Sequence, residues 1–147
     1  MDENAKHEKR LLSAGETDLR VLLAAMRPQA LPGEWFFGTV PLGTAVTAAA
    51  TVHESEGLSV VVDRREAERL GLSTTHAYRW ITLRVHSSLE AVGLTAAVSA
   101  ALTEHDVSCN VIAGAFHDHV LVPAGSLETA IVALEQLSER AEVDPEP

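Results

Sequence analysis

The feature that most constrains the fold is an alternation of side chains with period two in the second half of the chain. Over residues 78–85 two sets of side chains alternate, with Trp80, Thr82 and Arg84 in one set and Ile81, Leu83 and Val85 in the other. Successive side chains of a strand point to opposite faces, so this stretch predicts a β-strand. The spacing then becomes helical, and Ser87 or Ser88 is expected to cap a helix that reaches about Glu104.

The remainder of the second half predicts a hairpin and a final helix. Residues 107–116 and 119–122 have strand composition, and a tight turn at His117-Asp118 makes them antiparallel neighbours. A helix then starts within residues 123–126, with an apolar face formed by Leu127, Ala130, Ile131, Leu134 and Leu137. The order βαββα predicts an α+β sandwich with helices on one face of an antiparallel sheet.

The first half predicts helix, three strands and helix. Thr17 is the expected N-cap of a short helix that Pro28 ends. Strands are expected at 35–40, 45–53 and 58–62, in a three-stranded meander. Asp63 and Glu66 resemble a capping box at the start of a helix over residues 64–70, and Gly71 is placed to end that helix.

The domain boundaries follow from these elements. Residues 1–16 and 142–147 are expected to be disordered tails, because they are polar and lack a periodic apolar face. Residues 17–75 and 76–141 are then two units that share a core. With 46% hydrophobic and 22% charged residues over 147 positions, the chain has the composition of a globular protein.

Charge and cysteine content narrow the partners. The net charge is −10, and no segregated basic patch is evident, so nucleic acid and anionic membranes are not expected as partners. The lone Cys109 can form no internal disulfide, and it is expected to be a buried small hydrophobe rather than a nucleophile. No apolar run has the roughly 18 residues needed to span a bilayer. We expect a cytoplasmic protein.

Three segments of the second half carry a family resemblance. Residues 92–112 (VGLTAAVSAALTEHDVSCNVI) resemble the first helix and second strand of ACT domains, such as the regulatory units of aspartokinases. Residues 86–94, followed by 110–114 and by His117-Asp118-His119, look like an uncharacterised bacterial family of tandem ACT proteins. The arginine sensors of the CASTOR type look like distant relatives.

The resemblance implies a fold, a function and a site. The fold is a ferredoxin-like βαββαβ sandwich in each of two ACT-like units. The function is regulation by a small ligand, usually an amino acid, with no catalysis, no cofactor and no metal, in a homodimer. By motif position, the implied ligand-binding residues are His86, Ser87, Leu89, Gly93, Leu94, Asn110, Val111 and Ile112.

Elementary chemistry makes such a site reasonable, and a purely structural interpretation stays open. Unpaired N–H groups at the helix start near Gly93 and Leu94 suit a carboxylate, and the Asn110 amide oxygen could accept from an ammonium. Alternatively, Ser87 and Glu90 form a capping box, Gly93 only allows close packing, and Asn110 only closes a strand.

Three alternatives of other classes remain. A protein-interaction module would keep the fold with a vestigial ligand site. A metal-dependent hydrolase would use His117 and His119, which two-residue spacing places on one side of a strand. A serine hydrolase would need Ser87 or Ser88 with His117 and Asp118, but the chain has no nucleophile-elbow motif. The sequence does not identify the ligand.

Overall fold

The computed structural model describes residues 2–13 and 15–143. Helices and strands follow in the order α1 (Glu3–Ser13), α2 (Leu19–Ala24), β1 (Pro28–Ala30), β2 (Trp35–Val40), β3 (Ala50–Glu54), β4 (Gly57–Asp63), α3 (Arg64–Arg69), β5 (Tyr78–Leu83), α4 (Leu94–Thr103), β6 (Asn110–Ala113), β7 (Asp118–Pro123), η1 (Ala124–Ser126) and α5 (Leu127–Val143). No helix among the described residues is long and apolar enough to cross a bilayer.

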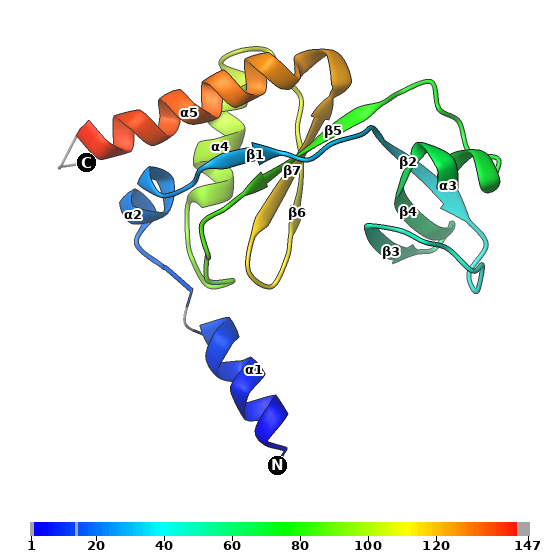
Figure 1. The fold of residues 1–147 in the computed structure, drawn as a ribbon, viewed down its shortest axis with the longest axis horizontal. Coiled ribbons are helices and arrows are strands. Elements are labelled where there is room, and N and C mark those ends of the chain that lie inside the picture. Colours follow the sequence, from blue (N-terminus) through cyan, green and yellow to red (C-terminus); the bar gives the residue numbers. More distant parts are fainter. Residues whose placement is uncertain (1, 14, 144–147) are drawn as a thin grey trace.

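One continuous antiparallel sheet runs through the molecule in the order β3-β4-β2-β5-β7-β6, and β1 also pairs with β5 (Figure 1). β1 and β2 follow each other closely in the chain, separated by residues 31–34. β1 pairs with β5, whereas β2 pairs along its whole length with β4. Trp35 in β2 also pairs with Tyr78 in β5. The first unit is therefore β3-β4-β2-β5 and the second is β6-β7-β5-β1. Each unit takes its fourth strand from the other.

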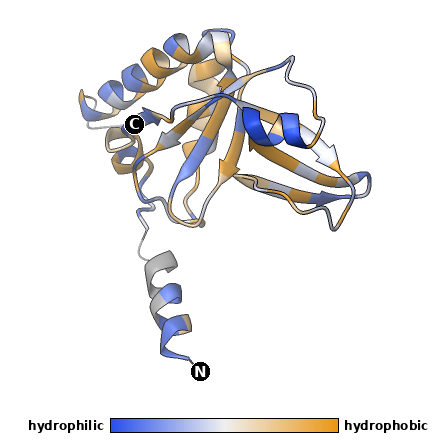
Figure 2. Ribbon diagram, turned by 45° about the vertical axis from the view of Figure 1, so that its right-hand side comes forward, coloured by the Kyte–Doolittle hydropathy of each residue, from blue (hydrophilic) through white to orange (hydrophobic). Residues whose placement is uncertain are grey.

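Helices α2, α3, α4 and α5 pack on one face of this sheet, where most of the core lies. In the second unit, α4, α5 and α2 cover β5 and β7, and fully buried residues of this core are Leu22, Met26, Ile81, Leu102, Val120 and Leu134. In the first unit α3 covers a smaller core of Phe36, Val40, Leu58, Val60, Val62 and Ala67. The central strands are mainly hydrophobic, whereas the helices also carry hydrophilic residues (Figure 2).

The helix-free face carries an aromatic layer that joins the units. Trp80 lies 5.2 Å from both Trp35 and His119, measured between ring centroids, and Phe37 lies 5.0 Å from Tyr78. Trp80 is nearly buried in this layer, in a cluster with Val61 and Leu121. The sheet is therefore apolar on both faces where the two units meet, as expected for strands that both units share.

The first half departs from its predicted pairing. β2 pairs with β4 and not with β3, so the three strands are not a meander in space. Residues 41–49 instead cross the sheet before β3 begins, and Val46 and Ala48 pack on the core. The predicted strand 45–53 is confirmed only from residue 50 onward. The strands predicted at 35–40 and 58–62 are confirmed.

The helix caps of the first half are partly as predicted. α2 is capped by Asp18 rather than Thr17, because the Asp18 carboxylate accepts from the N–H of Val21. Asp63 caps α3 by accepting from the N–H of Glu66, as the capping-box pattern predicts. The Glu66 side chain does not reach back to Asp63; it accepts instead from the N–H of Thr47, 19 residues away.

The predicted start of the long helix in the second half is wrong. α4 begins at Leu94, with Gly93 as its N-cap, so neither Ser87 nor Ser88 caps it. Gly93 has φ 105°, a left-handed conformation that an α-helix does not contain, and the helix therefore cannot extend back through it. The predicted strand 107–116 shortens to β6. β7 and α5 lie where the sequence predicts them.

The N-terminal segment contains more regular structure than the expected tail. α1 occupies Glu3–Ser13 and extends away from the sheet (Figure 1). Glu16 forms a parallel bridge to Ser87. At the other end α5 continues to Val143, and the expected C-terminal tail otherwise lies outside the described residues.

Candidate functional site

The loop between β5 and α4, residues 84–93, is held on two sides. The hairpin between β6 and β7 supports one side, where the N–H of Ser87 donates to the carbonyl oxygen of Phe116 over 3.2 Å. The N-terminal segment supports the other side, where the N–H of Ser88 donates to the carbonyl oxygen of Glu16 over 3.0 Å. Backbone hydrogen bonds therefore anchor both sides of this loop, although it has no regular secondary structure.

A small cleft of about 120 Å³ lies under this loop. Its walls come from the loop, from the first turn of α4, from the end of β6 and from the start of β7, and the lining residues are Ser87, Ser88, Leu89, Ala91, Leu94, Thr95, Ala113 and Asp118. Its volume suits a molecule with only a few non-hydrogen atoms. The lining contains one charged side chain, Asp118, and it contains no basic residue.

The polar groups of the cleft lie at two places. On one side, the hydroxyl of Ser87, a buried residue, donates to Oδ2 of Asp118 over 2.9 Å. On the other side is the start of α4, which has no side-chain cap. Within residues 2–13 and 15–143 no acceptor is found for the N–H groups of Leu94, Thr95 and Ala96. The cleft thus combines a carboxylate with the positive end of a helix dipole.

Comparison with known proteins identifies the family. Residues 14–79 match one model of the ACT domain and residues 75–136 match a second. A crystal structure of a Vibrio cholerae protein of unknown function, described as a possible transport protein, is 40% identical over 82% of this chain and 95% of its own, with a TM-score of 0.72. The chain belongs to the ACT-domain family. It carries two ACT units in tandem.

Two further structures share the fold of this tandem ACT protein. A protein from Agrobacterium tumefaciens is 15% identical over 76% of this chain and 87% of its own, with a TM-score of 0.60. The aspartate kinase of Clostridium acetobutylicum, described as an allosteric enzyme, is 9% identical over 85% of this chain and 37% of its own, with a TM-score of 0.54. A search of curated proteins gives no match.

The tandem ACT structure brings three of the eight predicted site residues together. Ser87, Leu89 and Leu94 line the cleft, and Leu89 is largely exposed at 63%. His86 and Gly93 flank it without lining it. The His86 ring stacks on Phe116 with 5.1 Å between centroids, and its buried Nε2 has no partner among the described residues. The Gly93 backbone faces the side chain of Leu19, because a Cβ built there would lie 2.8 Å from a Leu19 methyl.

The three predicted residues on β6 lie elsewhere. Ile112 packs with the aromatic layer on the helix-free face, and Asn110 lies on that same face by the alternation of the strand. Val111 packs into the main core beneath α4 and α5. From this second strand only Ala113 lines the cleft.

Asp118 is the charged residue of the cleft, and the predicted ligand set does not include it. The sequence draws attention to the motif His117-Asp118-His119, but it predicts Asp118 as a turn residue or as a member of a serine-hydrolase triad and not as a ligand-binding residue. Alternation along β7 places Asp118 on the cleft side, opposite to His119. A carboxylate between two histidines at the start of a strand was the available signal.

The two histidines of the motif have separate partners. Nδ1 of His117 is 3.0 Å from the carbonyl oxygen of Val85. Nδ1 of His119 accepts from Trp80 Nε1 over 3.1 Å, and Thr82 Oγ1 is 3.0 Å away. Burial lowers the pKa of His119, and the nearby His117 adds to this effect. Within the described part of the chain no three His, Cys, Asp or Glu side chains form a group that could hold a metal ion.

The hydrolase arrangement is likewise not assembled around the Ser87 hydroxyl. That hydroxyl donates directly to Asp118, whereas His117 and His119 bind Val85, Trp80 and Thr82 instead. Cys109 is half-buried against the main core, and burial raises the pKa of its thiol. A raised pKa disfavours the thiolate that a nucleophile requires.

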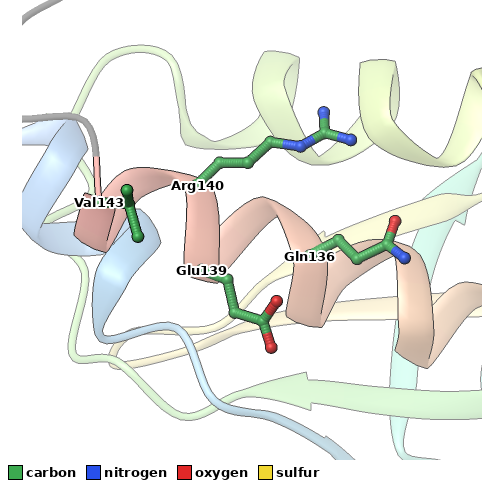
Figure 3. Close-up of a pocket in the computed structure, with 4 residues that line it drawn as sticks. All are labelled: Gln136, Glu139, Arg140 and Val143. Carbon is green, nitrogen blue, oxygen red and sulfur yellow. The ribbon is translucent and has the colours of Figure 1, made fainter.

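Two larger hollows lie on the outer surface of α5. One, of about 770 Å³, is lined by Gln136, Glu139, Arg140 and Val143 of a single helix, whose side chains point in different directions (Figure 3). The other, of about 710 Å³, lies between α2 and α5. Both are more open to solvent than the cleft at Asp118. Despite their size we regard the cleft at Asp118 as the better candidate site.

Proposed function

We propose that this tandem ACT protein binds a small α-amino acid in the cleft between loop 84–93 and β7, and that it acts as a regulatory module without catalysis. ACT domains are regulatory units that generally bind small molecules, amino acids in particular. The observation that carries the proposal is the pairing of an uncapped helix start with a carboxylate across a cleft of about 120 Å³.

The two ends of the cleft match the two charges of an amino acid. The ligand carboxylate binds the free N–H groups at Leu94 and Thr95, where the helix dipole favours an anion. The ligand ammonium binds Asp118, which Ser87 orients through its hydroxyl. The apolar walls at Leu89, Ala91 and Ala113 leave space only for a short side chain, so glycine, L-alanine and L-serine are the preferred candidates.

A thermal-shift screen of all twenty amino acids tests this proposal. A ligand at about a hundredfold excess over its Kd stabilises the protein by about 2.7 kcal/mol. We expect the shift for the small amino acids and its loss in Asp118→Asn, which removes the charge that the ammonium requires. Asp106→Asn is the matched control, because Asp106 is exposed at the far end of α4 with φ 56°, a conformation that Asn tolerates. A shift that survives in Asp118→Asn would refute the assignment of this site.

The alternative of a protein-interaction module has one observation in its favour. Leu89, Val92 and Phe116 leave 63%, 83% and 41% of their surfaces exposed, and all three lie on the loop or hairpin that frames the cleft. Exposed apolar residues in one region are typical of contact surfaces. If no amino acid shifts the transition, this interpretation becomes the better one.

We also propose that the protein forms a homodimer through an exposed edge of its sheet. β3 and β6 lie at the two ends of the strand order β3-β4-β2-β5-β7-β6, and unpaired edges favour strand addition. β6 is the preferred edge, because its last residue, Ala113, already lines the cleft. Sedimentation of the wild-type protein measures this directly. A monomeric wild type would refute the dimer.

A further inference from the structure

The segment Gly15–Leu19, which we call the N-terminal strap, lies across the loop that frames the cleft. The N–H of Glu16 donates to the carbonyl oxygen of His86 over 2.9 Å, and the N–H of Ser88 donates to the carbonyl oxygen of Glu16 over 3.0 Å. The strap is thereby a short parallel addition to the loop at Ser87. It joins the loop to α1, which precedes it in the chain.

The strap fits the loop with no space to spare at its first residue. A Cβ at Gly15 would lie 2.5 Å from the backbone nitrogen of Ser88 and 2.7 Å from the carbonyl carbon of Ser87. Backbone atoms cannot move aside as a flexible side chain can, so only glycine allows this approach. At its other end the strap places Leu19 against Gly93. The strap therefore contacts the loop near its start and at its end.

The two ends of the strap are held in different ways. Oε1 of Glu16 accepts from the N–H groups of Thr17 and Asp18, each over 2.8 Å. Asp18 caps α2, whose Leu22 is fully buried in the main core. Leu19 is therefore fixed by α2. Glu16 is attached to the loop by two backbone hydrogen bonds, a small anchorage that can open locally.

We propose that the strap couples occupancy of the cleft to the N-terminal helix α1. This inference rests on the proposed function, because the same loop supplies Ser87, Ser88 and Leu89 to the cleft. A ligand that fixes the loop also fixes the surface on which Gly15 and Glu16 dock. Two events that stabilise one conformation must strengthen each other equally, so seating of the strap raises ligand affinity and the ligand holds the strap. The position of α1 then depends on the ligand.

Hydrogen exchange of the full chain, measured by mass spectrometry without ligand, tests the first half of this coupling. Gly15→Ala introduces the Cβ that collides with Ser88. Gly125→Ala is the matched control, because a Cβ at Gly125 meets nothing within 4 Å. We expect peptides covering 84–93 to exchange about tenfold faster in Gly15→Ala and at the wild-type rate in Gly125→Ala. Equal exchange in the two variants would overturn the proposal that the strap holds the loop.

Titration with L-alanine and L-serine as probes tests the second half. We expect a probe that binds the wild type to slow exchange across 15–19, and we expect its affinity to fall about tenfold in Gly15→Ala but not in Gly125→Ala. Equal affinity in both variants would overturn the coupling and leave the proposed function intact. If neither probe binds the wild type, the proposed function fails for these ligands and the coupling fails with it, whatever the exchange without ligand shows.

Discussion

The two ACT units have the same four-stranded frame but fill the space above it differently. In the second unit the chain crosses the sheet as the helix α4, which packs against α5 through Val98 and Leu102. In the first unit the corresponding crossing is the irregular segment 41–49, and α3 is only six residues long. The smaller core of the first unit follows from this difference, because a single short helix covers little apolar surface.

Polar contacts hold the crossing segment of the first unit in place, whereas apolar packing holds the crossing helix of the second unit. Glu66 accepts from the N–H of Thr47, and Arg69 donates to both Glu66 oxygens over 2.7 and 2.6 Å and to the carbonyl oxygen of Ala45 over 2.8 Å. These bonds attach the crossing segment to α3. In this comparison only the second unit, with its complete crossing helix, places an uncapped helix N-terminus beside the third strand, and this unit carries the candidate site.

The two units also differ at the start of their third strands, which are β4 in the first unit and β7 in the second. β7 begins with Asp118, which is paired with Ala113, and β4 begins with Gly57, which is paired with Glu54. The residue that would face a ligand ammonium in the second unit is thus a glycine in the first. A Cβ at Gly57 would lie 2.7 Å from the carbonyl oxygen of Val40, so this position has no space for a side chain. The candidate site of the second unit therefore has no equivalent at this position of the first.

The largest effects are expected from removing core side chains in each unit. Phe36→Ala in the first unit is expected to cost about 3 to 5 kcal/mol, and Leu102→Ala in the second about 2 to 5 kcal/mol, since both side chains are fully buried. Because β5 and the β1–β2 path each serve both units, both variants should shift one common transition. Urea denaturation followed by tryptophan fluorescence and by circular dichroism measures this. Separate transitions for the two probes would show that the units fold independently.

An intermediate effect is expected at the left-handed residue that starts α4. Gly93→Ala should cost about 1 to 2 kcal/mol, because an L-residue is strained at φ 105°. Its Cβ would also displace Leu19. The first unit has no helix at this place. Thermal denaturation compares this variant with Gly125→Ala, which should stay within about 0.5 kcal/mol of the wild type. Equal stability of the two variants would contradict the strain argument.

The sequence predicts the strands and helices better than it predicts how they are connected. Alternation and caps locate β2, β4, β5, β7 and α3, because these signals lie within a few neighbouring residues. The order β3-β4-β2 and the exchange of fourth strands depend on contacts between distant segments, which no local pattern encodes.

The site was predicted in part for the same reason. Loop 84–93 was found from its resemblance, but Asp118 comes to the cleft only through the register of β7 with β6, in which Asp118 pairs with Ala113. Asn110 was an attractive ligand residue by type, and strand alternation places it on the other face. Ser87 is predicted both as a ligand-binding residue and as a possible cap, because it precedes a helical pattern; its hydroxyl does not cap α4 but donates to Asp118. Pairing between distant strands decided each of these positions.

A smaller effect, dependent on pH, should be confined to the first unit. The hydrogen bonds from Arg69 and Thr47 lower the pKa of Glu66 from 4.5 to about 2. A carboxyl group with a lowered pKa in the folded state stabilises the protein above its unfolded pKa, and this stabilisation is lost as pH falls from about 4.5 toward 2. Glu66→Gln should flatten the pH dependence of the unfolding free energy in that range. Glu68→Gln, an exposed neighbour on the same helix, should not. Parallel profiles for the two variants would refute this role of Glu66.

The smallest effect is expected at the aromatic layer, which belongs to both units. Trp80 Nε1 can only donate, so Nδ1 of His119 must accept and the neutral ring carries its proton on Nε2. Protonation of His119 places a second hydrogen between Trp80 Nε1 and His119 Nδ1. This contact is unfavourable, which agrees with the lowered pKa of His119. A histidine whose pKa is lowered in the folded state stabilises the protein above its unfolded pKa, and that stabilisation is lost as pH falls below about 6.5.

His119→Gln should therefore reduce the loss of stability between about pH 7.5 and about pH 5.5, relative to the wild type. The control is His105→Gln, an exposed histidine at the end of α4, which should leave the wild-type loss unchanged. Urea denaturation followed by tryptophan fluorescence is the suitable measurement, because Trp35 and Trp80 are the two tryptophans of the chain and both lie in the aromatic layer. If both variants lose stability as the wild type does, the bond between Trp80 and His119 does not couple the junction of the units to pH.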